Sequence, residues 1–222
     1  MRLVNSKYNL KIEFEENKST ELVVENKECM IDIVQNLLSQ VDGIEGDFVL
    51  AAEKEMKMEK DVLFIIDPFS VDFNNKKIIT KLYEQLSQIA KEENEGYDSI
   101  NSEIVSTLEK ICGCVEYSNV QYDLEFDWKN LFKLYNVRIG EDYKNIYEKL
   151  EEYIKILVDV LKVKLIIFLN LMEYLPYDKI DNIRHIGFYK KVSMLFIESE
   201  ERKEFGDNNI FIIDKDRCLI VK

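Results

Sequence analysis

One apolar run, from Val163 to Asn170, restricts the possible folds more than any other stretch of the chain. It is short, rich in β-branched and aromatic residues, and shows no alternation of apolar and polar positions, which is typical of a parallel-sheet strand buried on both faces. A second run of the same kind extends from Asp61 to Asp67, and the sequence between the two runs is mostly helical in pattern. We therefore expect an α/β fold with a mostly parallel sheet and with residues 163–170 at its centre.

The composition indicates a folded, globular chain. Of the 222 residues, 46% are hydrophobic, seven are glycine and two are proline, which excludes a low-complexity or fibrous protein. No apolar stretch is long enough to cross a bilayer, and the N-terminus lacks the apolar core of a signal peptide, so we expect a cytoplasmic protein with no membrane partner. The cysteines are too few and too scattered for a disulfide framework, and we expect buried thiols at Cys29, Cys112, Cys114 and Cys218.

The formal net charge of −13 argues against extensive contact with nucleic acid, because an acidic surface repels phosphate. The excess of acidic residues is confined to the part of the chain before Val163, and from there on basic and acidic residues are equal in number. Any contact with a polyanion must therefore be local.

A short strand at Leu22 to Val24 precedes a loop and then a helical stripe of apolar residues between Met30 and Leu38. Strand, loop and helix in this order open an α/β unit. In a P-loop protein the loop would contain glycines, so that backbone amides approach the phosphates, and a lysine to supply charge. Residues 25–28 contain no glycine. We expect the topology of such a unit without its phosphate cradle.

Residues 98–162 are expected to form a separate helical domain. The polar stretch 91–98 is the best candidate for a boundary, and the helical segments 99–116 and 143–162 carry apolar stripes that can face one another. Such an antiparallel pair makes a projecting α-helical leg. Residues 1–97 and 163–222 would then form an α/β head domain, which begins and ends with antiparallel hairpins.

An acidic cluster lies between the two leg helices. Asp123, Glu125 and Asp127 occupy every second position, so their carboxylates share one face if the segment is extended, and Glu116 lies one loop earlier. Grouped oxygen ligands suit calcium better than zinc. The cluster is not an EF-hand, because it lacks the glycine and the final glutamate of that loop. The alternative is a solvated acidic edge whose intervening apolar residues point into the core of the leg.

Four sequence blocks occur in a familiar order: residues 61–67, 122–127, 163–170 and 192–199. In order, spacing and hydrophobic shape they resemble the Csn-type adaptation protein of type II-A CRISPR systems. The match extends from about Leu22 to the C-terminus, and its sharpest part is the Asp-Leu-Glu-Phe-Asp block that begins at Asp123. The first twenty residues match poorly.

The resemblance implies a head with a degenerate P-loop fold, a helical leg, and a ring-shaped homotetramer that threads double-stranded DNA. It implies a role in acquiring new spacers for antiviral defence, with the CRISPR integrase complex and effector nuclease as partners and without enzymatic activity. It also implies a calcium cofactor at acidic residues of the leg, which in this sequence are Glu116, Asp123, Glu125 and Asp127.

No sharp motif marks the residues that would face DNA. Sequence-independent binding needs only lysines and arginines on one surface, and a ring collects four copies of any basic patch in its lumen. The candidates are Lys76 and Lys77 at a predicted helix start, where the helix dipole adds positive charge, and Lys190 and Lys191 in the neutral C-terminal part. Each of them also fits an ordinary exposed lysine.

Single residues argue against most catalytic sites. His185 is the only histidine, so Ser-His-Asp, Cys-His and multi-histidine metal sites each lack a part, and we expect a structural role for it. Asp67 ends a strand where α/β proteins place functional acids, but without a phosphate loop we expect a strand-end cap. Trp128 is expected to anchor a core rather than to stack on a base. The competing hypotheses are an enzyme of nucleotide-binding descent that binds ATP through an altered loop, and a scaffold for other proteins.

Overall fold

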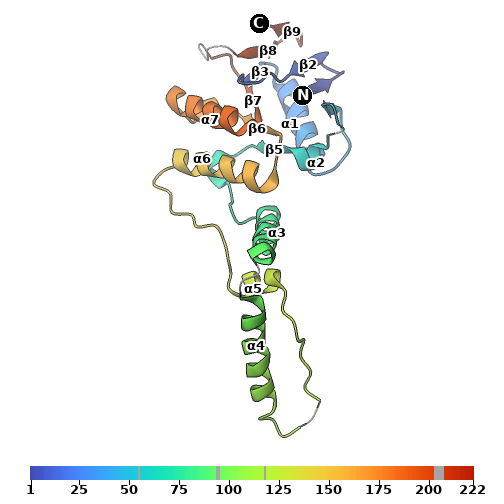
Figure 1. Cartoon of the computed structure of the whole chain (residues 1–222). Coiled ribbons are helices and arrows are strands. Elements are labelled where there is room, and N and C mark those ends of the chain that lie inside the picture. The colour runs from blue at the N-terminus through green and yellow to red at the C-terminus, as the bar shows by residue number, and fades with distance from the viewer. Residues whose placement is uncertain (55, 94–95, 118, 203–207) are drawn as a thin grey trace. The chain divides into compact units, whose positions relative to one another are not determined.

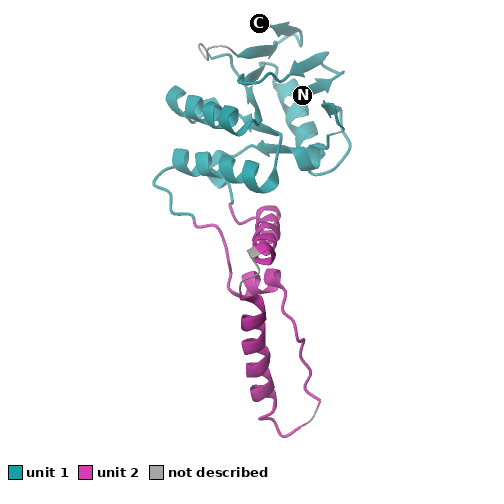
Figure 2. Ribbon diagram, in the orientation of Figure 1, with its two compact units in different colours: residues 1–72, 141–222 teal, residues 73–140 magenta. Residues whose placement is uncertain are grey.

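A six-stranded sheet organises the first of the two units into which the chain divides, residues 1–72 and 141–222 (Figure 2). The structure is a computed structural model that describes every residue except 55, 94–95, 118 and 203–207. The six strands, in their order across the sheet, are β5 (Val62–Ile65), β6 (Leu165–Leu169), β7 (Ser193–Glu198), β3 (Thr20–Val24), β8 (Asn209–Ile213) and β9 (Leu219–Val221). Neighbouring strands are parallel except for β8 and β9. The prediction of an α/β fold with a mostly parallel sheet is confirmed.

The strand β6 lies inside the sheet, between β5 and β7, and its first four residues are buried. It is not the central strand that we predicted, because the middle of the sheet lies between β7 and β3. The early strand β3 inserts between two late strands and pairs Leu22 with both Ile197 and Phe211. The position of β3 in the sheet could not be predicted, because the local pattern of apolar residues does not depend on which strands lie beside it.

A second, three-stranded antiparallel sheet is formed by β2 (Leu10–Glu13), β1 (Arg2–Asn5) and β4 (Phe48–Ala51), in that order. The predicted N-terminal hairpin is confirmed as β1 and β2. Leu10 and Ile12 are buried whereas Lys11 and Glu13 are exposed, so the alternation in the sequence corresponds to one buried face.

Helices cover both faces of the six-stranded sheet (Figure 1). On one face, α1 (Lys27–Val41) buries Cys29, Ile33 and Leu37 in a cluster shared with the small sheet and with α2 (Met58–Asp61). The other face is covered by α7 (Tyr177–Lys190) and α6 (Ile146–Ile156), the latter continuing as the π-helix η2 (Leu157–Leu161). Gly187 of α7 sits so close to the sheet that an added Cβ would lie 2.6 Å from Met194. Two 3₁₀ turns follow strands, η1 (Pro68–Ser70) after β5 and η3 (Leu171–Glu173) after β6.

The second unit, residues 73–140, contains α3 (Lys76–Glu93), α4 (Tyr97–Cys112) and α5 (Trp128–Leu134) (Figure 2). α3 packs against α5, with the rings of Tyr83 and Phe132 5.8 Å apart and the Tyr83 hydroxyl donating to the Val137 carbonyl at 2.9 Å. Asn75 caps α3, since its side-chain oxygen accepts from the Ile78 amide. No residue of α4 is fully buried. The unit therefore has little core of its own.

The division between the units falls at residues 72 and 140, whereas the sequence placed the helical domain at residues 98–162. α3 belongs to the helical unit because its apolar side lies on α5. α6 belongs to the α/β unit, where Leu150, Ile154 and Leu157 are fully buried and the helix packs against α7. The apolar stripe of residues 143–162 is therefore satisfied by the α/β unit, and not by residues 99–116 as predicted.

Two of the four cysteines do not fit the prediction of buried thiols. Cys29 is buried in α1 and Cys112 is half-buried, but Cys114 and Cys218 are exposed. Cys114 follows the end of α4 and Cys218 lies in the turn between β8 and β9, and both places are at the surface.

Candidate functional site

The loop from β3 to α1 occupies the place of a phosphate-binding loop, and its polar groups are already used. The Asn26 side-chain oxygen accepts from the amides of Glu28 and Cys29, at 3.0 and 3.1 Å, and its amide group donates to the Lys215 carbonyl at 2.9 Å. Arg217 pairs with the Glu28 carboxylate. The first turn of α1 thus presents a capping side chain and an acidic residue where a phosphate would need free amides and positive charge.

Two glutamates, Glu21 of β3 and Glu198 of β7, are buried in the sheet with 1% of each residue exposed. Glu21 lies opposite Phe196 in the register, so Glu21 and Glu198 project from the same face of adjacent strands. One carboxylate oxygen of Glu198 accepts from the Met172 amide at 3.1 Å. Among the residues that the structure describes, neither oxygen of Glu21 has a hydrogen-bond partner.

Burial dominates the electrostatics of this pair. Desolvation, followed by the nearby charge of Glu201, raises the pKa of Glu21 from 4.5 to about 7, although Arg202 and Arg184 oppose the rise. Desolvation also raises the pKa of Glu198 to about 7, against the hydrogen bond from Met172. Neither glutamate was predicted as a site residue. The signal that could have identified them is that each lies within an otherwise apolar strand.

Arg184, from α7, is buried beneath the same face of the sheet. Its guanidinium donates to the Ser19 hydroxyl at 2.7 Å, to the Asn208 side chain at 2.6 Å and to Asp181 at 3.2 Å. These contacts join α7 to the start of β3 and to the residue before β8. The cation is fully engaged in structural contacts.

The four predicted calcium ligands, Glu116, Asp123, Glu125 and Asp127, are all exposed. Where the structure describes the chain, it gathers no group of three or more acidic, cysteine or histidine side chains that could hold a metal ion. The structure therefore does not bring these carboxylates together. Leu124, predicted to point into a core, is 65% exposed, whereas Phe126 is half-buried.

The predicted DNA-binding lysines lie at two separate helix ends. Lys76 and Lys77 are exposed in the first turn of α3, at the helix start predicted for them. Lys190 ends α7 and forms an ion pair of 2.6 Å with Asp159, so its charge is partly neutralised. Lys191 is exposed and adopts a left-handed conformation with φ 53° at the C-cap of α7.

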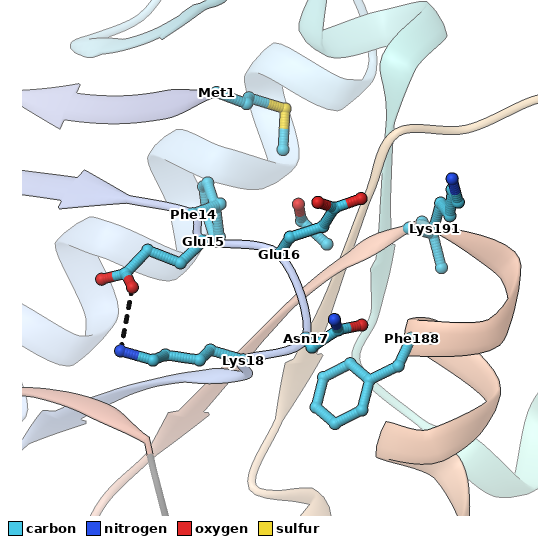
Figure 3. A pocket seen from close by; sticks show the side chains of 11 residues that line it. Met1, Phe14, Glu15, Glu16, Asn17, Lys18, Phe188 and Lys191 are labelled. Carbon is cyan, nitrogen blue, oxygen red and sulfur yellow. Dashed lines mark ion pairs between the residues drawn. The ribbon is translucent and has the colours of Figure 1, made fainter.

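Lys191 also lines a small cavity of about 170 Å³ at the amino ends of β3 and β7 (Figure 3). Its other walls come from the β2–β3 loop and α7, and Figure 3 shows the ion pair of 2.8 Å between Lys18 and Glu15 on one of them. Ligands of parallel α/β sheets bind at the carboxyl ends of strands, which is the opposite edge. We assign this cavity no ligand.

The single residues singled out in the sequence have simple environments. The Asp67 carboxylate accepts from the Phe69 amide at 2.8 Å, which lowers the pKa of Asp67 and confirms its capping role after β5. His185 is a surface residue whose side chain is 69% exposed and lies 3.3 Å from Asp181.

Among the described residues, no helix combines the length and the apolar character needed to cross a membrane.

These features define a class of protein: a two-unit α/β chain with a parallel sheet, a helical insertion, and a glycine-free loop at the place of a phosphate cradle. A family model described as CRISPR-associated protein (Cas_Csn2) matches residues 40–217. The match covers most of the chain and all of the helical unit, so the chain belongs to this family. The family resemblance found in the sequence is thereby confirmed, and the protein has a role in CRISPR systems.

Two relatives have the same description, CRISPR-associated protein Csn2. The protein from Enterococcus faecalis is 26% identical over 185 residues, which cover 82% of this chain and 83% of the relative. The protein from Streptococcus agalactiae is 26% identical over 166 residues, 72% of each chain. Among solved structures, an inward-facing ABC transporter of the metal-chelate type aligns with a TM-score of 0.47 and 8% identity, over 96% of this chain and 75% of its own.

Proposed function

We propose that this protein acts in CRISPR adaptation as a non-enzymatic homotetrameric ring that binds double-stranded DNA without sequence preference and loads at DNA ends. Calcium would be its cofactor, and the integrase complex and effector nuclease would be its partners during spacer acquisition. The observation that carries the proposal is the family match over residues 40–217.

The β3–α1 loop supports a function without nucleotide hydrolysis. Asn26 already caps the helix, and Glu25 and Glu28 place negative charge beside it. An incoming phosphate would have to displace the cap and approach two carboxylates, which opposes the favourable helix dipole. We expect the protein to release no phosphate from labelled ATP in a hydrolysis assay.

The surface of the helical unit supports self-association. Several of its large apolar side chains are more than half exposed, namely Ile111, Tyr117, Leu124, Leu134 and Tyr135. Apolar side chains that are exposed in one chain lose less by contact with another chain than by contact with water. In a homo-oligomer these residues would be covered by other copies of the chain.

Local positive charge supports contact with the duplex. Lys76 and Lys77 combine two exposed cations with the positive end of α3. Repeated by the symmetry of a ring, they would present positive charge to the phosphates although each subunit is acidic. Lys191 is a further candidate, whereas Lys190 would contribute less because Asp159 neutralises it.

A gel-shift comparison of linear and covalently closed circular DNA of equal length, with and without calcium, tests the proposal. We expect the protein to shift linear DNA, to fail to shift closed circles, and to bind more tightly with calcium, because a closed ring needs an end for threading. Affinity should fall steeply with salt. Equal affinity for linear and closed circular DNA would refute threading. If the protein is monomeric and does not bind duplex DNA at low salt, the whole proposal is refuted.

A further inference from the structure

An open pocket in the helical unit is lined largely by aromatic side chains. Its walls are Ala90 and Lys91 of α3, Tyr97 of α4, and the consecutive residues Phe126, Asp127 and Trp128, and its volume is about 220 Å³. The three aromatic residues are half-buried, so part of each stays accessible to solvent. The three rings contact one another pairwise, next to helices α4 and α5, in which no residue is fully buried.

The rings are fixed against one another. Tyr97 and Phe126 have centroids 4.8 Å apart at 32°, and Phe126 meets Trp128 edge-on at 5.1 Å and 80°. The Tyr97 hydroxyl donates to the Phe126 carbonyl at 3.1 Å, and Trp128 stacks on Phe132 at 5.9 Å. Trp128 thus packs on Phe132 and also forms a wall of the pocket, and because it is only half-buried it is not the core anchor that the sequence predicted.

Size and polarity restrict what the pocket can bind. An apolar cavity of roughly 150 Å³ binds benzene, so this pocket accommodates one substituted aromatic ring. Lys91 places an exposed cation at one wall. Asp127 holds the N-cap position of α5 without a capping hydrogen bond from its side chain, and it places an exposed carboxylate at the pocket as a hydrogen-bond acceptor. A planar ring with amino groups and an anionic tail satisfies all three features.

We propose that this pocket binds an unpaired nucleobase at a single-stranded DNA end, stacked on the ring of Phe126 with Trp128 against its edge, with Asp127 accepting from the base and Lys91 contacting its phosphate. The inference rests on the proposed function, because it adds a subsite for frayed or overhanging ends to sequence-independent duplex binding. Stacking on an aromatic side chain discriminates little between bases, so the subsite would keep that independence.

Trp128 is the only tryptophan, so its fluorescence reports on this pocket alone. We would titrate the protein with a blunt duplex and with the same duplex carrying a three-nucleotide overhang, and measure affinity in parallel by anisotropy of labelled DNA. Stacking of one base contributes roughly a five- to hundredfold effect. We expect the overhang to quench Trp128 and to bind about tenfold more tightly than the blunt duplex.

Phe126→Ala should remove this preference, so that both duplexes bind with the affinity of the blunt one, whereas Phe126→Tyr should retain it. Tyr189→Ala, at an 84% exposed tyrosine of the other unit, is the matched control and should leave the preference unchanged. Equal wild-type affinity for the two duplexes, or a preference that survives Phe126→Ala, would overturn the subsite.

Titration with deoxyadenosine monophosphate separates this proposal from the proposed function. If no DNA binds but the mononucleotide quenches Trp128 saturably, and Phe126→Ala abolishes the quenching, the subsite stands and duplex binding is refuted. If duplexes bind while neither overhang nor mononucleotide quenches Trp128, the proposed function stands and the subsite is refuted.

Discussion

Replacing Glu21 by glutamine should make the free energy of unfolding depend less on pH. Glu21 is 1% exposed, its carboxylate has no hydrogen-bond partner in the described part of the chain, and its pKa is raised from 4.5 to about 7 by burial. The folded state therefore binds this proton more tightly than the unfolded state does. The stability gained from the neutral form is fully present below pH 4.5 and is lost as the pH rises through 7.

The size of the effect follows from the two pKa values. A rise from 4.5 to about 7, at 1.36 kcal/mol for each pH unit, corresponds to about 3 kcal/mol of stability lost by pH 8, and to less than about 1 kcal/mol lost at pH 5. A glutamine side chain does not titrate, so it makes no pH-dependent contribution to the free energy of unfolding. Its unpaired amide lowers that free energy by about 1–3 kcal/mol, and this cost is the same at every pH. The difference between Glu21→Gln and wild type should thus shift by about 2–3 kcal/mol in favour of the variant between pH 5 and pH 8.

Urea unfolding followed by circular dichroism at pH 5, 6, 7 and 8 measures this difference. Glu200→Gln, at an exposed glutamate of the neighbouring segment, is the control and should show almost no such trend. A difference for Glu21→Gln that is constant to within about 0.5 kcal/mol across this range would mean that the carboxyl group titrates normally, and would refute the reasoning.

Three further predictions follow from single contacts. Asn26→Ala should lower the free energy of unfolding by about 1 kcal/mol in urea titrations, because it removes the cap of α1, while Asn26→Ser should retain most of it. Ile154→Ala should lower it by about 2–5 kcal/mol because the side chain is fully buried in the α/β unit, and a cost under about 1 kcal/mol would contradict the placement of α6. Replacing Lys76 and Lys77 together by methionine should weaken duplex binding and reduce the slope of log affinity against log salt by about 2 for each subunit in contact, and an unchanged slope would exclude them from the interface.

Strand identity was predictable where the side chains alone determine burial. The run at 163–170 forms an interior strand, and Leu10 and Ile12 are buried in a half-exposed strand, because an apolar residue needs the same environment whichever strand lies beside it. The neighbours of each strand were not predictable. The insertion of β3 between β7 and β8 depends on contacts nearly two hundred residues apart, which a local pattern cannot encode.

The partner of the helix at 146–156 could not be predicted for the same reason. Its apolar stripe of Leu150, Ile154 and Leu157 indicates only that one face is buried, and either a second helix or a sheet can bury it. In the structure the α/β unit buries this face. The buried glutamates are a different failure, because a polar residue inside an apolar strand indicates an exposed position in most proteins, and here desolvation is tolerated by raising the pKa of Glu21 and Glu198.

The proposed calcium ligands lead to a coupled mechanism. Asp123, Glu125 and Asp127 are exposed side chains on an irregular segment, and across the described part of the chain they gather into no metal-binding group. A calcium ion that takes six to eight oxygen ligands would have to bring together carboxylates that repel one another. The ion would therefore act by changing the conformation of the segment that carries Asp123 and Glu125, and not by filling a preformed cavity. Any contact that this segment makes with DNA would then be linked to the ion, and linkage is reciprocal, so duplex DNA must tighten calcium binding by the same factor by which calcium tightens duplex binding.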